Sequence, residues 1–133
     1  VLPSVLNSSD FIKDKYSQAI YGTREMPSCN LSSPKKWIEY GDDNVVKNPY
    51  KLLPSISSYL GMNIDLDDIE IEESESIANG GAALSAYAKM QFTDGEVLKA
   101  LEQALLTYCE LDTLAMVFIW EYFYNELEKI EKK

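Results

Sequence analysis

The chain has 133 residues, of which 46% are hydrophobic and 26% charged, a composition that indicates one folded domain with an apolar core and excludes disorder throughout. Its formal net charge of −10 opposes nonspecific attraction to a nucleic-acid backbone, so positive charge for such a partner would have to come from elsewhere. The longest apolar run, residues 114–120, is far shorter than the roughly 20 residues that cross a bilayer, and no membrane partner is expected.

The start of the sequence and its cysteines indicate a cytoplasmic protein. The chain begins at Val1, and its first residues have neither the basic start nor the small-residue cleavage site of a signal peptide. Cys29 and Cys109 lie far apart and there is no histidine, which favours reduced thiols over a disulfide framework or a zinc site. We therefore expect a cytoplasmic protein, and a chain that is a piece of a longer one.

The N-terminal third predicts a short helix, a loop and a β-hairpin. Ser8 and Ser9 are plausible N-caps for a helix that ends near Ile20. Residues 23–34 are rich in Pro, Ser and Asn without apolar periodicity, and predict a loop without a chemical role. In residues 37–46, two short runs of β-favouring residues flank a Gly-Asp-Asp-Asn turn, which predicts a hairpin.

The middle of the chain predicts a helix followed by an acidic segment. Residues 50–60 carry apolar side chains at helical spacing, although Pro54 must lie in the first turn of this helix or break it. Residues 64–75 interleave seven acids with aliphatic residues and predict a solvated linker or an edge strand. They lack the alternating ligands, central glycine and closing glutamate of a calcium-binding loop. The acids are Asp65, Asp67, Asp68, Glu70, Glu72, Glu73 and Glu75.

The rest of the chain predicts helices. A glycine pair at residues 80–81 precedes small residues, which suits a closely packed helix better than a phosphate-binding loop, because the Lys and Ser/Thr of a P-loop are missing. Thr93 and Glu96 have the spacing of a capping box and open a helix that runs through Tyr108. A second helical stretch, residues 111 to about 130, is largely apolar, and we expect it to be buried in a larger core or covered by a partner.

No internal repeat and no persuasive domain boundary is visible along these elements. The chain is therefore predicted to be a single domain, residues 1–133, of the α+β class, mainly α with a small β-hairpin.

Tyr108 and Asp112 are the residues that could carry chemistry. Residues four apart on a helix share a face, so their phenol and carboxylate could meet at one site. Metal-dependent phosphodiester cleavage needs such a pair, because carboxylates hold divalent ions while a hydroxyl orients the attacking water. A helix N-cap role for Asp112 is the simpler alternative. Glu110 points away from the shared face at helical spacing, and we expect it to be solvated.

Three motifs in order carry a resemblance to a known family. The Tyr-x-x-x-Asp spacing of Tyr108 and Asp112 is similar to the third motif of the DEDD exonuclease superfamily, in its tyrosine-bearing branch. With two further motifs it resembles the C-terminal half of a bacterial domain family of unknown function that is related to the exonuclease-like ribonuclease-H fold. The resemblance covers about residues 37–124. Its motifs are Asn48-Pro49-Tyr50-Lys51-Leu52-Leu53-Pro54, Asn79-Gly80-Gly81-x-Ala83 and Tyr108-Cys109-Glu110-Leu111-Asp112-Thr113-Leu114-Ala115-Met116-Val117.

The resemblance implies the C-terminal helical portion of a ribonuclease-H-like domain and a two-metal 3′–5′ exonuclease. In that family pattern Asp112 would be a ligand of Mg²⁺ or Mn²⁺, and Tyr108 would position the nucleophilic water. The superfamily's first motif, Asp-x-Glu, and its second-motif Asp cannot be placed in this sequence, and one carboxylate cannot hold two divalent ions. The pattern therefore implies that this chain alone is inactive, and that the remainder of a parent chain completes a site for single-stranded nucleic acid.

A different class of function fits the same residues. The chain could be a noncatalytic protein-interaction module that keeps the Tyr-x-x-x-Asp box for structure alone, with its tyrosines and apolar helix serving a protein partner. The acidic charge and the missing first motif favour this alternative. A single structural metal at Asp112 is a weaker one, because the sequence offers no histidine and no second ligand nearby. The nuclease and the interaction module both stay open on the sequence.

Overall fold

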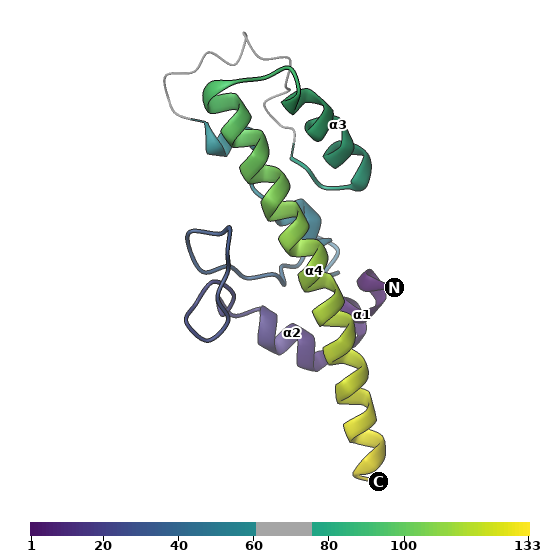
Figure 1. Cartoon of the computed structure of the whole chain (residues 1–133). Helices are drawn as coiled ribbons and strands as arrows, with labels where there is room; N and C mark the ends of the chain where they lie inside the picture. Colours follow the sequence, from purple (N-terminus) through teal and green to yellow (C-terminus); the bar gives the residue numbers. More distant parts are fainter. Residues whose placement is uncertain (61–75) are drawn as a thin grey trace. The chain divides into compact units, whose positions relative to one another are not determined.

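The computed structural model describes residues 1–60 and 76–133, and in these ranges the chain is mainly helical, as predicted (Figure 1). The helices are α1 (Leu2–Ser8), α2 (Asp10–Tyr16), the 3₁₀ helices η1 (Pro49–Leu52) and η2 (Ile56–Tyr59), α3 (Gly80–Met90) and α4 (Gly95–Glu131). None of these described helices is long and apolar enough to cross a bilayer. The chain divides into a first unit, Val1–Pro49 with Glu110–Lys133, and a second unit, Tyr50–Cys109, and α4 contributes to both.

Ser9 separates α1 from α2 and caps the latter. Its Oγ accepts a hydrogen bond from the Ile12 N–H at 3.2 Å, and Asp10 adds a negative charge to the first turn. The predicted N-cap is therefore confirmed at Ser9, whereas Ser8 is the last residue of α1. α2 ends at Tyr16, earlier than predicted, and the apolar pattern gives no indication of α1.

Residues 37–46 form a turn rather than the two strands of the predicted hairpin. Tyr40 and Val46 make one isolated antiparallel bridge. Asn44 adopts the left-handed conformation, with φ of 59°, which asparagine tolerates better than most residues. No strand is assigned within the described ranges, so the hairpin is not confirmed.

The arms of this turn bond to the helices as well as to each other. Between the arms, the Gly41 N–H donates to the Val45 carbonyl at 2.9 Å and the Lys47 N–H donates to the Glu39 carbonyl at 2.7 Å. The N–H groups of Trp37 and Ile38 both donate to the Tyr16 carbonyl at the end of α2, at 2.9 and 3.0 Å. The Val46 N–H donates to the Asn7 side-chain oxygen at 3.0 Å. Because a backbone donor that is used in this way cannot also join a ladder, a regular pair of strands does not develop here.

The core of the first unit gathers on one face of α4. Leu111, Leu114, Ala115 and Phe118 recur at helical spacing and are buried. The Phe118 ring meets Tyr16 of α2 edge-on, with ring centroids 4.5 Å apart. The other buried apolar side chains of this unit are Val5, Leu6, Ile12, Tyr21, Trp37, Ile38 and Val46. In the first unit, α4 is thus anchored through one side.

The second unit packs η2, α3 and the N-terminal part of α4 around a small aliphatic core. Its buried members are Ile56, Ile77, Ala86, Ala100, Leu101 and Ala104. Asn79 caps α3, since its Oδ1 accepts a hydrogen bond from the Ala82 N–H at 2.8 Å. Ala86 is buried in this core and Ala83 packs against it, whereas Ser85 and Ala88 are exposed, so close packing accounts for part of the small residues of α3.

Residues 50–60 form two 3₁₀ helices rather than the predicted α-helix. η1 ends at Leu52, η2 begins at Ile56, and Pro54 lies between them. Proline lacks a backbone donor and clashes with the preceding turn, so the interruption occurs where the sequence marks it. The acidic segment predicted as a linker or edge strand, residues 64–75, lies outside the described residues.

α4 runs without a break over 37 residues, where the sequence patterns predict two helices. Neither glycine nor proline occurs between Glu96 and Glu131, so nothing in the chain ends the helix near Tyr108. The Thr93 hydroxyl, which the predicted capping box assigned to this helix, instead donates to the Lys89 carbonyl at the end of α3.

Candidate functional site

Tyr108 and Asp112, the predicted catalytic pair, lie one turn apart on α4 in different surroundings. Tyr108 is partly buried and packs against the aliphatic core of the second unit. Its ring lies beside Tyr50, with centroids 5.6 Å apart and planes tilted by 51°. Asp112 is exposed and belongs to the first unit. It lies in the interior of α4, so it cannot be the N-cap that the sequence allowed.

The carboxylates of the described residues do not assemble a metal centre. Within residues 1–60 and 76–133, no group of three or more acidic, cysteine or histidine side chains is placed to hold an ion. Asp112 supplies one carboxylate, whereas ions such as Mg²⁺ bind through several oxygens. The residues present do not fit a two-metal site by themselves, and binding of Mg²⁺ or Mn²⁺ at Asp112 stays a prediction.

Glu110 is a bound carboxylate, contrary to the expectation that it is solvated. Its Oε1 accepts hydrogen bonds from the Tyr21 hydroxyl at 2.7 Å, the Ser28 hydroxyl at 2.7 Å and the Cys29 N–H at 3.0 Å. Its Oε2 accepts from the backbone N–H of Asn30 at 3.2 Å and from the amide of the same side chain at 3.0 Å. Five donors from the segment after α2 thus converge on one carboxylate of α4.

These hydrogen bonds keep Glu110 ionised. Burial alone would raise the pKa of this carboxyl, but the bonds from Tyr21, Ser28 and Asn30 outweigh burial and hold the pKa below its ordinary value. Burial, and then the hydrogen bond to Glu110, raise the pKa of Tyr21, so its phenol stays a donor. The predicted loop, residues 23–34, is therefore tied to α4 by charge-assisted hydrogen bonds.

Glu121 makes a second contact of this kind. Its Oε1 accepts hydrogen bonds from the Tyr16 hydroxyl at 2.8 Å and from the Lys15 ammonium group at 2.9 Å. Burial, and then this bond to Glu121, raise the pKa of Tyr16, so the hydroxyl keeps its proton. The other oxygen, Oε2, is buried and has no hydrogen-bond partner in the described chain. Glu110 and Glu121 therefore fasten the C-terminal part of α4 within the first unit.

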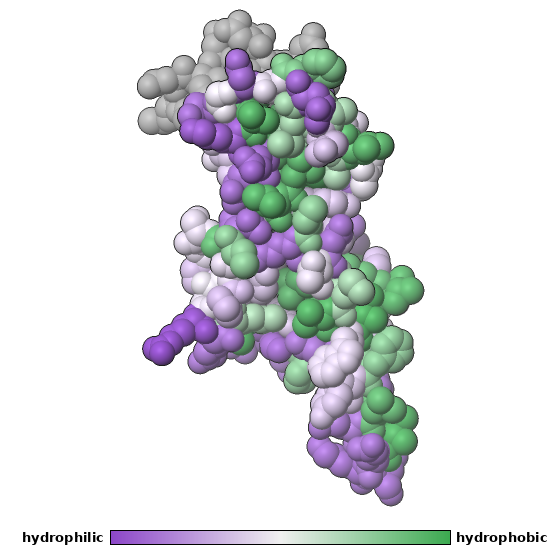
Figure 2. All heavy atoms as spheres, viewed as in Figure 1, coloured by the Kyte–Doolittle hydropathy of each residue, from purple (hydrophilic) through white to green (hydrophobic). Residues whose placement is uncertain are grey.

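A row of exposed apolar side chains lies on another side of the C-terminal part of α4. We call this row the apolar seam. Its five members are between 56% and 71% exposed: Met116, Trp120, Phe123, Leu127 and Ile130. Figure 2 shows hydrophobic surface that continues along this part of the helix. Single exposed apolar residues need no explanation, but a contiguous row of this kind is typical of a binding surface.

The apolar seam follows a heptad repeat. From Met116 to Ile130 the spacing alternates between four and three residues, which is the spacing of the d and a positions over about two heptads. With about 100° of rotation per residue, the seam lies nearly opposite the anchored face that contains Leu114 and Phe118. The sequence indicated an apolar helix here, but an all-round apolar pattern does not separate the two faces.

Aromatic and charged side chains border the seam. The Tyr124 ring stacks on Trp120, with centroids 5.1 Å apart and planes 18° from parallel, and Val117 is also exposed. Further along, the Lys129 ammonium group pairs with Glu126 at 2.7 Å. The seam is therefore an apolar strip with an aromatic flank and charges of both signs around it.

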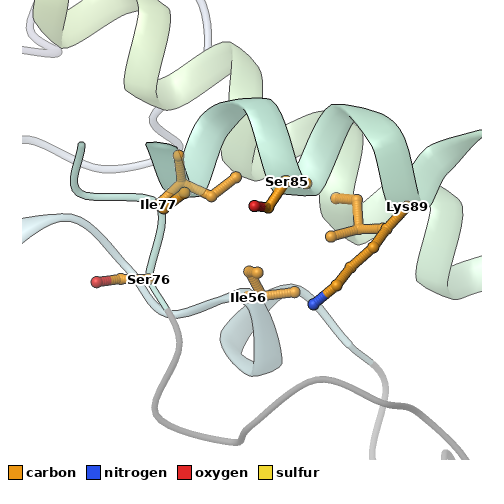
Figure 3. A pocket seen from close by; sticks show the side chains of 8 residues that line it. Ile56, Ser76, Ile77, Ser85 and Lys89 are labelled. Atoms are coloured by element: carbon orange, nitrogen blue, oxygen red, sulfur yellow. The ribbon is translucent and has the colours of Figure 1, made fainter. Parts of the chain in front are cut away.

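The second unit contains a small pocket that borders α3 (Figure 3). Its volume is about 230 Å³, below the roughly 300–1,000 Å³ of typical small-molecule sites. Figure 3 shows Ser85 and Lys89 of α3 on one side and Ile56 on another. The polar side chains among its described lining residues are those of Ser76, Ser85 and Lys89.

Comparison with known proteins adds no relative to this picture. No family model, curated protein or solved structure matches the chain.

Proposed function

We propose that this chain is a noncatalytic interaction module that binds a helix of a protein partner through the apolar seam. The observation that carries the proposal is the row of five large, mostly exposed side chains at heptad spacing. Such a row gives a partner helix a continuous set of anchors at the i, i+3, i+4 and i+7 positions. This is the interaction-module alternative that the sequence left open.

The side chains around the seam favour a protein over a membrane or a nucleic acid. Helices that lie on membranes carry Lys and Arg on their polar face, whereas residues 121–133 contain four glutamates and three lysines. The net charge of −10 also opposes binding to phosphate backbones. Trp120 and Tyr124 belong to the residue types that contribute most to protein interfaces.

The part of the seam from Met116 to Phe123 is held in place before any partner binds. Phe118 is buried on the opposite side of the same helical segment, and Glu121 is bonded to Tyr16 and Lys15 of α2. A helix that is already ordered loses less conformational entropy on association than a segment that must fold first. The anchored side of α4 thus supports binding on the exposed side.

The exonuclease fragment is the alternative proposal. It rests on the spacing of Tyr108 and the exposed Asp112 on α4, and on the resemblance over residues 37–124. It would make the chain part of a ribonuclease-H-like domain, with a hairpin near Tyr40 and single-stranded nucleic acid as substrate. Mn²⁺-dependent removal of 3′ nucleotides that disappears in Asp112→Asn would favour this alternative over the interaction module.

Site-specific photo-crosslinking in cells that express the chain tests the interaction proposal. A benzophenone amino acid replaces Phe123 in the seam or, as a matched control, Phe92, which is 93% exposed and lies outside α4. We expect a protein adduct at position 123 that is lost when Leu127→Glu is added, and none at position 92. Equal labelling at both positions, or no adduct at position 123, would contradict the proposal.

A further inference from the structure

We infer that the partner of the apolar seam is a second copy of this chain, packed antiparallel through α4. This inference rests on the proposed function and names the occupant of the same surface. Three properties of the seam carry it: its repeat, its extent and the charges that flank it.

The repeat of the seam is self-complementary. Residues at a and d positions of one heptad helix fit the holes of another helix with the same repeat. With the two helices antiparallel and centred between Trp120 and Phe123, Trp120 of one copy faces Phe123 of the other. In the same register Met116 faces Leu127. The largest side chains thus meet at the centre of the pair and the smaller ones meet further out.

The extent of the seam suits a dimer. An aromatic side chain removes roughly 150–250 Å² of accessible surface from water when it becomes fully buried. Trp120, Phe123 and Tyr124 are each more than half exposed, and Met116 and Leu127 add aliphatic area. Each copy therefore offers several hundred Å², of the same order as the roughly 800 Å² per partner in a standard interface.

Flanking residues select the antiparallel arrangement. With Leu127 at an a position and Ile130 at a d position, Glu126 takes a g position and Glu131 an e position. In a parallel pair, Glu126 of each copy would therefore lie beside Glu131 of the other, and this repulsion would occur twice.

In the antiparallel register, Val117 instead lies beside the Tyr124 of the other copy, and Asp112 lies beside its Lys133. Ile119 lies beside Glu126, and Glu131 lies beside Glu110, whose carboxylate is already bonded to Tyr21 and Ser28 of its own chain. Each of these contacts occurs twice by symmetry. Of the two arrangements, the antiparallel one is distinguished by the opposite-charge pair of Asp112 and Lys133.

Sedimentation equilibrium of the purified full chain tests the stoichiometry. We expect dimer at micromolar to 100 micromolar concentrations for the wild type and for Phe92→Glu, and monomer for Leu127→Glu. Circular dichroism should be unchanged in both variants, because both side chains are exposed. Ile130→Glu, at the end of the same seam, provides a second variant should Leu127→Glu fold poorly.

Charge reversal tests the orientation. Asp112→Lys and Lys133→Asp should each weaken dimerisation, by about 3- to 10-fold for two exposed ion pairs, and the double variant should recover the wild-type affinity. A dimer whose affinity none of these variants changes would overturn the antiparallel arrangement.

The two proposals fail in different ways. A chain that stays monomeric at 100 micromolar, while photo-crosslinking at Phe123 captures a different protein, overturns the second copy and leaves the interaction module standing. A monomeric chain with no adduct at Phe123 overturns both. An adduct whose mass equals two chains, lost in Leu127→Glu, supports both.

Discussion

In the first unit, two sides of α4 both carry large apolar side chains, but in opposite surroundings. One side buries Leu114 and Phe118 against the rest of the unit, while the other side leaves Phe123 and Leu127 exposed. Hydrophobicity alone does not distinguish these faces. The polar contacts distinguish them, because Glu110 accepts a hydrogen bond from Tyr21 and Glu121 accepts one from Tyr16, and both tyrosines belong to the N-terminal part of the first unit. One helix can therefore stabilise a fold through one face and serve association through the other.

Truncating one phenylalanine on each side of α4 gives the largest expected contrast. Phe118→Ala removes a fully buried ring in contact with Tyr16, and should lower the free energy of unfolding by about 3–5 kcal/mol. Phe123→Ala removes a ring that is more than half exposed, and should change it by less than about 0.5 kcal/mol in dilute, monomeric chain.

Urea unfolding followed by tryptophan fluorescence measures this contrast. Trp37 and Trp120 both belong to the first unit, so the signal reports the unit that contains the two phenylalanines. Losses of similar size in both variants would show that the seam is part of the core of the monomer.

Removing the Glu110 carboxylate should have the next largest effect. Glu110→Ala leaves donors of Tyr21, Ser28 and Asn30 without their acceptor, and should cost about 1–3 kcal/mol of the free energy of unfolding. Glu131→Ala, at the exposed C-terminal end of the helix, is the control and should be near neutral. The same fluorescence-detected urea titration compares them. A loss no larger than that of the control would mean that the network adds nothing to stability.

The pH dependence of stability should carry the signature of Glu110. Because its pKa is lower in the folded chain than its ordinary value of 4.5, the stability that it contributes is fully present above pH 4.5. That contribution is lost as the pH falls through the lowered folded pKa. The difference in unfolding free energy between wild type and Glu110→Gln should therefore shrink between pH 5 and pH 3. A difference that stays constant over this range would contradict the assignment.

Features of the fold that depend on neighbouring residues could be predicted from the sequence. Ser9 is a cap because a serine hydroxyl can accept the bond of an early N–H, and Pro54 interrupts its segment because it lacks a donor. Both effects depend on a few neighbouring residues. The strands of the hairpin were not confirmed, and the reason is nonlocal: Trp37 and Ile38 bond to Tyr16, and no local propensity records that contact.

The candidate site could be predicted only in part. The apolar character of residues 111–130 could be predicted from the sequence, but which face is exposed depends on the side that α2 occupies. Glu110 was missed because its donors are about 80 to 89 residues away in the chain. The predicted loop, residues 23–34, looked uninformative, although its Ser28-Cys29-Asn30 run, together with Tyr21 before the loop, satisfies the carboxylate.

Tyr16→Phe should have the smallest of these effects and tests the other end of the anchored face. The substitution keeps the ring that contacts Phe118 and removes only the hydroxyl that donates to Glu121, so the expected loss is about 1 kcal/mol of the free energy of unfolding. Tyr40→Phe, which alters an exposed tyrosine, is the matched control and should be neutral. If Tyr16→Phe were equally neutral, the Lys15 ammonium group alone would satisfy Glu121, and the Tyr16 hydroxyl would add nothing to the anchoring of α4.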